Sequence, residues 1–392
     1  MNVLNISMII PLEGLKREND IILKVQSYLS EQYGYNFKVA KSLPYVNPVL
    51  AKLSKKWSKY LFYQHKKHIK VNGQDVMVYP WFLLPTSNVW INYWLIPFNY
   101  LMCKYKLFKE LDEYVGDIDL IIAQNTIPDS ILAYWLSKRY SVPFIVNERQ
   151  QENLVDLQKK IPLLKQVFKK AKRILTPNPS ISKRLIKGRK VELIPHPVES
   201  YFFDYKDERS SDGVPEFITV ARLLDWKNID MVIMALSRMK KEGFNFIYNI
   251  AGDGPERDKL QELIQKEGLQ NNVSLVGFLS HDELLSYYRK ANVFILPSYP
   301  ETFGRAFIEA AASGCLIVGH KKTGVEGLFT HNESAIFVDK DTIVNELRDF
   351  FASFQKGSFL YMVNNSKKIA ESMTWEKIGK LYHNIFTEAV TE

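Results

Sequence analysis

Asn292-Val-Phe-Ile-Leu-Pro297, followed by Y-P-E-T-F-G-R-A-F-I-E-A-A-A-S-G at residues 299–314, is the stretch of this 392-residue chain that decides its fold. The first segment is a short apolar run of the kind that forms a buried parallel strand. Residues 303–313 have helix-forming composition, and Gly314 suits the end of that helix. The pattern predicts a strand, a loop and a helix in succession, which is the repeating unit of an α/β fold.

Two carboxylates, Glu301 and Glu309, lie eight positions apart in this stretch. We expect Glu301 on the loop and Glu309 about two turns into the helix. The start of such a helix offers free N–H groups and a partial positive charge. The layout suits an elongated, hydroxyl-rich ligand with an anionic centre, bound at the carboxyl end of the strand.

The alternation of strands and helices continues on both sides of this unit. Apolar runs between residues 216 and 338 alternate with helical segments, which predicts a parallel sheet covered on both faces. Residues 1–200 show a similar alternation, and the polar residues 204–213 suit a linker. We expect an α/β protein of two doubly wound parallel-sheet, Rossmann-like domains, residues 1–200 and 201–392, facing a central cleft that binds ligands. The C-terminal helix is expected to pack back on the first domain.

Composition excludes several classes of protein. Hydrophobic content of 46% and charged content of 24% are ordinary for globular domains. The two cysteines, Cys103 and Cys315, argue against a disulfide framework and for a reducing compartment. The first residues lack the charged-then-apolar design of a signal peptide, and no uncharged apolar run is long enough to predict a transmembrane helix. These features predict a cytoplasmic location.

Four motifs follow one another in the second half of the chain. They are Val220-Ala-Arg222 with Lys227, Ala251-Gly-Asp-Gly-Pro255, Val276-Gly-Phe-Leu279, and Glu301 through Glu309 with Gly314. In this order and strand context they resemble the retaining glycosyltransferases of the GT-B fold, family 4, of the group 1 type. The resemblance covers most of residues 190–390 and extends weakly to the first half through Ile194-Pro-His-Pro197. It implies a UDP-, GDP- or similar sugar as donor, retention of anomeric configuration and no required cofactor or metal.

The resemblance also implies roles for single residues. Arg222 and Lys227 would hold the donor diphosphate, where fixed cations stabilise the charge that builds as the glycosidic bond breaks. Glu301 would contact hydroxyls of the donor sugar, and Glu309 would accept hydrogen bonds from the ribose hydroxyls. Further expected contacts come from the backbone of Thr302, Phe303 and Gly304, from Gly14 at the phosphates and from Phe278 near the base.

Structural alternatives remain for several of these residues. Gly252-Asp-Gly-Pro255 fits a tight turn better than a phosphate cradle. Phe278 suits a core aromatic equally well, and Glu301 alone could be only a negative charge at a helix start. Lys322-Thr-Gly-Val-Glu326 is a further candidate for closing over the donor phosphates. Asp117-Ile-Asp119 has the letters of a metal-binding D-x-D pair, but it precedes a strand of the first half and is interpreted as structural.

The first half departs from the family pattern. The family often has a histidine at the reacting sugar, after the strand that corresponds to Val142–Val146. This chain has Asn147-Glu-Arg-Gln-Gln151 there, so Glu148 or Arg149 occupies roughly that place. We hypothesise that one of these two side chains contacts the acceptor or donor sugar. Gly14 stands without the second glycine that the family usually has beside it.

Charge is divided unevenly between the halves. Residues 1–200 hold 30 Lys and Arg against 16 Asp and Glu, a balance of +14, and residues 201–392 hold 22 against 27, a balance of −5. Nine lysines and no acidic residue occur between Gln32 and Gln74. Five apolar or aromatic residues of this segment are spaced so that they would lie on one face of a helix, while the lysines lie mostly on other faces. They are Leu50, Leu53, Trp57, Tyr60 and Leu61. A second basic cluster comprises Lys159, Lys160, Lys165, Lys169, Lys170, Lys172 and Arg173.

This charge pattern is typical of an interfacial amphipathic helix, although a solvated helix whose apolar stripe is ordinary core gives the same spacing. Each Lys or Arg near an anionic leaflet contributes about 1 kcal/mol of binding. We therefore expect the first domain to dock on an anionic membrane surface, peripheral on the inner face. The expected acceptor is a glycan or a lipid-linked acceptor.

Other interpretations of the chain remain open. An inverting transferase or a sugar-nucleotide epimerase would share the fold. The +14 half is compatible with a nucleic-acid-binding protein, but the usual modular motifs are missing, and Arg222, Lys227, Glu301 and Glu309 would then have no explanation, so no nucleic-acid partner is expected. An inactive binding subunit is supported only by the missing histidine. The nucleotide, sugar, acceptor and linkage depend on a few side chains per site and are not predicted.

Overall fold

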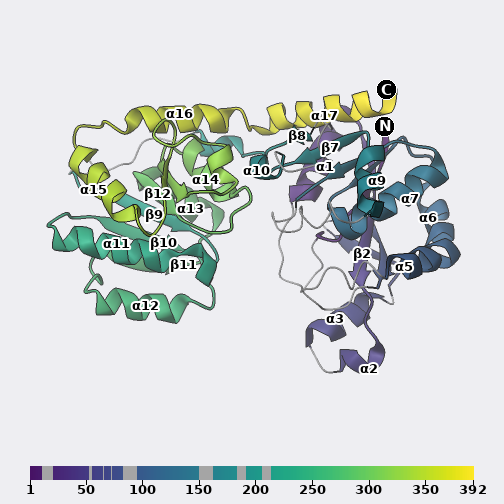
Figure 1. Cartoon of the computed structure of the whole chain (residues 1–392), viewed down its shortest axis with the longest axis horizontal. Helices are drawn as coiled ribbons and strands as arrows, with labels where there is room; N and C mark the ends of the chain where they lie inside the picture. The colour runs from purple at the N-terminus through teal and green to yellow at the C-terminus, as the bar shows by residue number, and fades with distance from the viewer. Residues whose placement is uncertain are drawn as a thin grey trace. The chain divides into compact units, whose positions relative to one another are not determined.

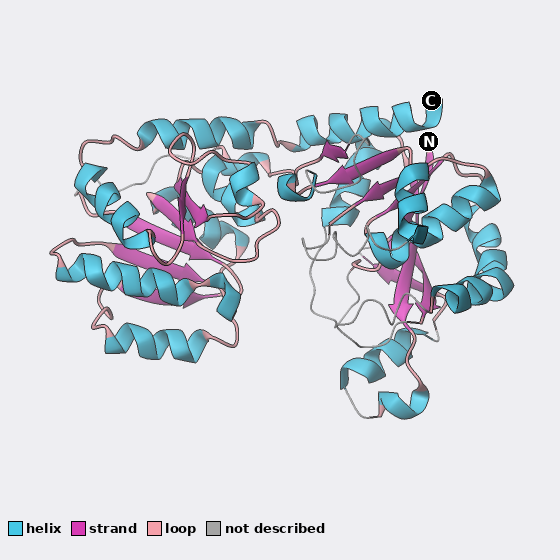
Figure 2. Cartoon of the chain, viewed as in Figure 1, coloured by secondary structure: helices cyan, strands magenta, loops and turns pink. Residues whose placement is uncertain are grey.

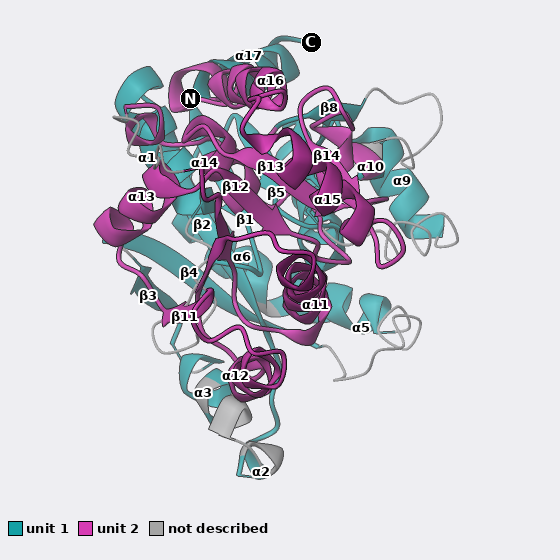
Figure 3. Ribbon diagram, turned by 90° about the vertical axis from the view of Figure 1, so that its left-hand side faces the viewer, with its two compact units in different colours: residues 1–177, 181–194, 379–392 teal, residues 178–180, 195–378 magenta. Residues whose placement is uncertain are grey.

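The computed structural model describes residues 1–10, 21–52, 55–64, 66–71, 73–82, 95–149, 162–182, 191–204 and 213–392. The chain forms two compact units, coloured separately in Figure 3. Unit 1 comprises residues 1–177, 181–194 and 379–392, and unit 2 comprises residues 178–180 and 195–378. The main crossing between them is at residues 194–195, before the expected linker, most of which lies outside the described residues. Helix α17 (Trp375–Thr391) begins in unit 2 and ends in unit 1.

Unit 1 is built on an eight-stranded sheet of order β3-β4-β2-β1-β5-β6-β7-β8. Its pairs are parallel except β3–β4, which form an antiparallel hairpin. Figure 2 shows the strands of the chain in magenta and the helices in cyan. Every residue of β5 and β6 is buried, as expected for strands covered on both faces. The strands are β1 (Asn2–Ile6), β2 (Asn36–Pro44), β3 (His68–Val71), β4 (Gln74–Trp81), β5 (Leu120–Ala123), β6 (Phe144–Asn147), β7 (Arg173–Thr176) and β8 (Val191–Leu193).

The helices of unit 1 lie between these strands in the chain (Figure 1). They are α1 (Ile21–Tyr33), α2 (Pro48–Ala51), α3 (Lys55–Gln64), α5 (Ile96–Met102), α6 (Phe108–Val115), α7 (Ile131–Tyr140), α9 (Pro162–Lys170) and α10 (Pro179–Ser182), the last shared with unit 2. Two π-helical turns, η1 (Cys103–Leu107) and η2 (Thr126–Ser130), precede α6 and α7. None of the described helices combines the length and apolar character needed to cross a membrane.

Unit 2 contains a six-stranded, all-parallel sheet of order β11-β10-β9-β12-β13-β14. The strands are β9 (Glu216–Val220), β10 (Ile247–Ala251), β11 (Val273–Gly277), β12 (Val293–Leu296), β13 (Leu316–His320) and β14 (Ile336–Val338). The helices are α11 (Ile229–Lys241), α12 (Arg257–Lys266), α13 (His281–Lys290), α14 (Arg305–Ala312), α15 (Ile343–Phe354) and α16 (Leu360–Glu371). The prediction of two doubly wound parallel sheets is confirmed.

The stretch at residues 292–314 forms the predicted strand, loop and helix. Strand β12 is completely buried, and Gly314 follows α14 with a left-handed φ of 78°, as the sequence predicts. Helix α14 begins at Arg305, later than expected, because Gly304 before it is also left-handed, with a φ of 69°. Glu309 therefore lies little more than one turn into the helix instead of two.

Candidate functional site: paired charges at the strand ends of unit 2

A lysine and a glutamate from two different loops meet in unit 2. Lys227 follows β9, and its Nζ lies 2.8 Å from Oε2 of Glu301, which follows β12. Both side chains are only 12% exposed. The Ser298 hydroxyl donates to the same carboxylate oxygen at 2.9 Å, and the Thr302 N–H donates to the other at 3.2 Å. A partly buried carboxylate with three donors is firmly oriented.

Strand order explains why residues so far apart in the chain come together. Strands β9 and β12 are parallel neighbours, so the loops after them leave the sheet at the same edge. Two further bonds join these loops: the Asn228 amide donates to the Pro297 carbonyl at 2.8 Å, and the Tyr299 N–H donates to the Trp226 carbonyl at 2.9 Å. The pairing of Lys227 with Glu301 is thus part of a cross-linked pair of loops.

Two other charged residues of the predicted donor site lie near these loops in the chain. Arg222 is exposed on the loop between β9 and Lys227. Glu309 is partly buried on α14, where the Arg305 guanidinium lies 3.6 Å from its Oε1. Burial, with Glu199 and then Glu309 as nearby negative charges, raises the pKa of Tyr201. Glu309 thus lies close to a tyrosine that the sequence did not single out.

The residues after Glu301 have well-defined surroundings. The Thr302 N–H is already used by the Glu301 carboxylate. Phe303 is buried and meets the His196 ring edge to face, with centroids 4.8 Å apart. A Cβ on Gly304 would come within 2.5 Å of the Phe307 ring, so a side chain there has no room. Gly304 is required for this reason and for its left-handed backbone.

Phe278, at the carboxyl end of β11, is 84% exposed. The alternative that it is a core aromatic is therefore wrong, while its place near a base stays a prediction. The segment 322–326 touches the Glu301 loop through the Gly324 N–H, which donates to the Glu301 carbonyl at 3.0 Å. Contact of this segment with phosphates also stays a prediction.

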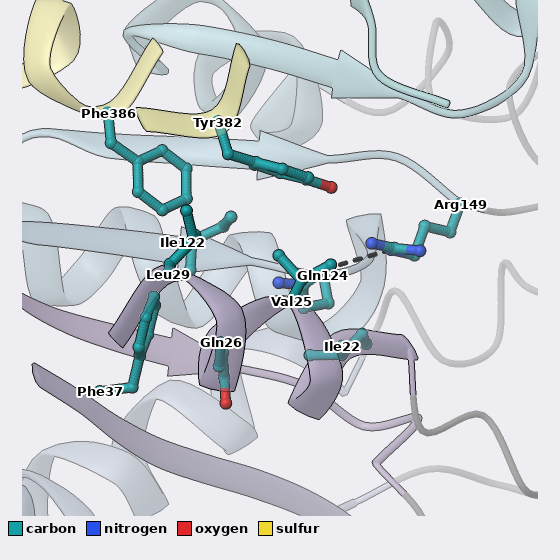
Figure 4. A pocket seen from close by; sticks show the side chains of 10 residues that line it. All are labelled: Ile22, Val25, Gln26, Leu29, Phe37, Ile122, Gln124, Arg149, Tyr382 and Phe386. Carbon is teal, nitrogen blue, oxygen red and sulfur yellow. Dashed lines mark hydrogen bonds between the residues drawn. The ribbon is translucent and has the colours of Figure 1, made fainter. Parts of the chain in front are cut away.

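In unit 1, Glu148 and Arg149 follow β6 but differ in environment. Glu148 is fully buried, and its N–H donates to the Leu175 carbonyl at 2.7 Å. Arg149 is partly exposed, and its Nε donates to Oε1 of Gln124 at 3.1 Å (Figure 4). Burial lowers the pKa of the Arg149 guanidinium, and the Tyr382 hydroxyl on α17, which points toward it, partly offsets this effect.

Gln124, which the sequence reasoning missed, links the ends of three strands. Its amide group donates to Asn5 Oδ1 at 3.0 Å, and its oxygen accepts from the Asn147 amide at 3.3 Å as well as from Arg149. The adjoining cavity, of about 10 Å³, is also lined by Gln26 and Tyr382. A space of this size holds about one water molecule and excludes a sugar ring, so it serves the network and not a substrate.

Several predicted site residues lie outside the described part of the chain. Gly14, Leu53, Lys159 and Lys160 belong to this group. The predicted amphipathic face is divided between α2 and α3, and its described member Tyr60 packs against the small cluster of Leu43 and Val78. For Tyr60, the alternative of ordinary core packing is therefore correct. Arg173 of the second basic cluster pairs with Glu192, Glu388 and Glu392, and so ties α17 to unit 1.

No group of three or more His, Cys, Asp or Glu side chains suited to a metal ion occurs among the residues that the structure describes. Asp119, the second aspartate of the Asp117-Ile-Asp119 sequence, accepts a hydrogen bond from the Asn2 N–H at 2.7 Å. That contact joins the start of β5 to the start of β1, which is the structural role that the sequence predicts.

Residues 202–368 match the model of the family described as glycosyl transferases group 1. The chain is similar to 2-deoxystreptamine N-acetyl-D-glucosaminyltransferase of Niallia circulans, with 41% identity over 90 residues, 23% of each chain. It is also similar to alpha-monoglucosyldiacylglycerol synthase of Streptococcus pneumoniae, with 27% identity over 300 residues, 70% of this chain and 67% of the other. The alignments span less than half of the first four curated relatives, between 23% and 48% of their lengths.

Among solved structures, that of Anabaena HepE in complex with UDP and glucose is similar over 98% of this chain and 99% of the other, with a TM-score of 0.64 and 16% identity. At this identity the likeness concerns the fold alone. It confirms the prediction of a GT-B type of fold made of two parallel-sheet α/β domains.

Proposed function

We propose that the chain moves a sugar from a nucleotide-diphosphate sugar to an acceptor hydroxyl, because its residues 202–368 match the model of the group 1 glycosyl transferases. The observation that carries this proposal is the pairing of Lys227 with Glu301 at the carboxyl ends of β9 and β12. Ligands of parallel α/β sheets bind at this edge. The similar HepE structure contains UDP and glucose, which supports a UDP- or related sugar as donor.

In the proposed mechanism, unit 2 stabilises the leaving nucleotide. Lys227 and Arg222 hold the diphosphate, whose negative charge grows as the glycosidic bond breaks, so their contribution is larger in the transition state than in the ground state. Glu301 accepts hydrogen bonds from the sugar hydroxyls and also fixes Lys227. Glu309 accepts hydrogen bonds from the ribose.

We propose that transfer retains the anomeric configuration, with the leaving diphosphate accepting the proton of the incoming hydroxyl on the same face of the sugar. In this scheme no carboxylate of the chain is a covalent nucleophile. Of the two residues after β6, Arg149 is the better candidate for contact with a sugar, because it is partly exposed while Glu148 is fully buried.

We propose a lipid-linked acceptor and a peripheral position on the inner face of the membrane. Support comes from the +14 balance of residues 1–200 and from the relative named as a diacylglycerol glycolipid synthase. Basic side chains near an anionic leaflet contribute about 1 kcal/mol each, enough for reversible docking by a handful of them.

A thermal-shift screen against a panel of sugar nucleotides tests the donor proposal. A ligand present at about 100 times its dissociation constant stabilises the native state by about 2.7 kcal/mol. We expect one base and sugar to stabilise the wild type, and the Glu301→Gln protein to respond much less to the sugar nucleotide while still responding to the free nucleotide. A Glu262→Gln protein, altered on the exposed side of α12, is the matched control. No stabilisation by any sugar nucleotide would contradict the proposal.

NMR of the product then tests the stereochemistry. With a donor of known configuration, a retained anomeric centre supports the mechanism above. An inverted centre would identify the alternative of an inverting transferase, and a changed free sugar nucleotide without transfer would identify an epimerase.

A further inference from the structure

Helix α5, the turn η1 and helix α6 form one continuous helical run over residues 96–115 in unit 1 (Figure 1). One face of this run packs into the core of unit 1. Its buried residues are Ile96, Asn99, Cys103, Leu107, Phe108, Leu111 and Val115. A surface helix with such an inner face ordinarily carries polar residues on the outside.

The outer face follows this rule only in its second half. There Lys109 is exposed, Glu110 pairs with Lys67, and Asp112 pairs with Arg139. The first half instead exposes four large apolar or aromatic side chains at positions i, i+3, i+4 and i+7. This apolar stripe comprises Phe98 (45% exposed), Leu101 (49%), Met102 (37%) and Tyr105 (79%).

The apolar stripe is anchored to the sheet. Both amide atoms of Asn99 bond the backbone of Phe82, its nitrogen donating to the carbonyl at 3.1 Å and its oxygen accepting from the N–H at 2.8 Å. Phe98 meets the Phe82 ring at 4.7 Å, and that ring stacks on Tyr45 at 4.3 Å. The stripe therefore belongs to an ordered surface at the carboxyl ends of β2 and β4.

The charges beside the apolar stripe indicate what covers it. Lys104 and Lys109 are exposed, and residues 95–109 contain no acidic side chain. Lysine is depleted in the buried core of protein–protein interfaces, whereas aromatic and aliphatic side chains flanked by lysine are typical of interfacial helices on anionic lipid. Lysines and Tyr also suit the headgroup region of a membrane.

We infer that the apolar stripe at residues 98–105 inserts into an anionic lipid surface, with Lys104 and Lys109 at the headgroups. The inference rests on the proposed membrane role of unit 1, and it moves the contact from the predicted face of α3, where Tyr60 is packed against the sheet, to the run α5–η1. The stripe then docks the enzyme where a lipid-linked acceptor is found.

Cosedimentation of the whole chain with vesicles of phosphatidylglycerol and phosphatidylcholine tests this inference. Replacing Leu101→Gln together with Tyr105→Gln is expected to weaken vesicle binding about ten-fold or more, since insertion strength scales with buried apolar area. The control is Leu360→Gln on α16, which removes a leucine of similar exposure (53%) from unit 2. The control should bind vesicles like the wild type.

A fluorescent label reports insertion directly. Cys103 and Cys315 are buried, and burial raises the pKa of the Cys103 thiol to about 12, so an added surface cysteine reacts selectively. An environment-sensitive dye on a Tyr105→Cys protein should shift to the blue with anionic vesicles, and the same dye on a Leu360→Cys protein should not. No shift at position 105 would overturn the inference, including the case in which another protein covers the stripe.

The two proposals fail in distinguishable ways. If sugar-nucleotide binding and transfer are absent while vesicle binding depends on Leu101 and Tyr105, the proposed function is wrong and the lipid surface stands. If the double variant keeps its thermal shift with the donor and binds vesicles as tightly as the wild type, the inference is wrong and the transferase stands.

Discussion

Two sets of neighbouring strand ends, one in each unit, are joined by different kinds of hydrogen bond. In unit 2 the turns after β9 and β10 join through backbone: the Ala221 N–H donates to the Ala251 carbonyl at 3.0 Å, and the Leu223 N–H donates to the Asp253 carbonyl at 3.0 Å. In unit 1 the Gln124 N–H donates to the Ile6 carbonyl at 2.9 Å, and the ends of β1, β5 and β6 are further joined by the side-chain amides of Asn5, Gln124 and Asn147.

This difference determines which substitutions each unit tolerates. A backbone contact leaves most side chains free to vary but forbids a Cβ at the point of closest approach, as at Gly252, where a Cβ would lie 1.8 Å from the Ala221 carbonyl oxygen. A side-chain network depends on each amide, because a buried polar group that loses its partner costs about 1–3 kcal/mol. Substitutions in both units should separate these two modes.

The largest effect is expected for Gly252→Ala. The new Cβ has no space, and φ at Gly252 is 131°, which side chains rarely adopt, so we expect a loss of at least about 4 kcal/mol in the free energy of unfolding. Urea unfolding measures it. Gly268→Ala is the control, since Gly268 also has a positive φ, of 69°, but open space around it, and should lose only about 1–2 kcal/mol. Equal losses at the two glycines would show that the close approach has no energetic consequence.

The next largest effect is expected for Lys227→Ala, and it concerns the rate of sugar transfer. It removes the cation that faces Glu301 at 2.8 Å, and we expect kcat/KM for the sugar nucleotide to fall about 10²–10³-fold. Steady-state kinetics measures the fall. Lys240→Ala, on the exposed side of α11, is the control and should keep wild-type kinetics. Wild-type activity of the Lys227→Ala protein would remove the charge pair from the mechanism.

Gln124→Leu should have a smaller effect, confined to unit 1. It removes the acceptor of Arg149 Nε and the partner of two buried amide groups, those of Asn5 and Asn147, so we expect a loss of about 2–3 kcal/mol in stability. Stabilisation of unit 2 by the donor nucleotide should persist in a thermal-shift assay. Gln265→Leu, on exposed α12, is the control. Loss of nucleotide binding in the Gln124→Leu protein would show that the two units are not independent in this respect.

The same contrast explains how much of each unit could be predicted from the sequence. In unit 2, Gly252, Pro255 and the charged residues Lys227 and Glu301 come shortly after apolar strands. The strand order then accounts for the fold and for the closeness of Lys227 to Glu301. In unit 1 a polar residue after a strand, such as Gln124, resembles any other strand end. Its partner Asn5 is 119 positions away, and only the order β1-β5-β6 brings the two together.

The apolar stripe at residues 98–105 could not be predicted from the sequence for a related reason. Residues 95–105 are mostly apolar, but the sequence alone does not say which face of a helix formed there is buried. Packing decides this, since Ile96, Asn99 and Cys103 fill the inner face and leave Phe98 and Leu101 outside. Predicted helical faces therefore need the structure before they can be assigned to a membrane or to a core.

A last pair of buried side chains in unit 1 predicts a pH dependence of stability. Asp129 is completely buried, and its Oδ2 accepts from the Met8 N–H at 3.1 Å, while Lys41 donates to the Met8 carbonyl. Burial raises the pKa of Asp129 from 3.8 to about 7, although the Met8 bond and the Lys41 charge oppose the rise. Burial lowers the pKa of Lys41 from 10.5 to about 8. The Tyr79 hydroxyl is a further titratable group near Asp129.

The folded state holds the Asp129 proton more tightly than the unfolded state, so stability should fall as pH rises from about 4 to about 7, by at most about 1.4 kcal/mol per pH unit. For Lys41 the unfolded state holds the proton more tightly, so stability should recover between about pH 8 and pH 10.5. Urea unfolding across this range should show a minimum near pH 7–8, and Asp129→Asn should remove the fall on the acid side. Asp341→Asn, at an exposed position of unit 2, should leave the profile unchanged. If Asp129→Asn keeps the acid-side slope, Asp129 is not its source, and buried side chains of unit 1 contribute less to its stability than the contrast with the backbone-joined turns of unit 2 implies.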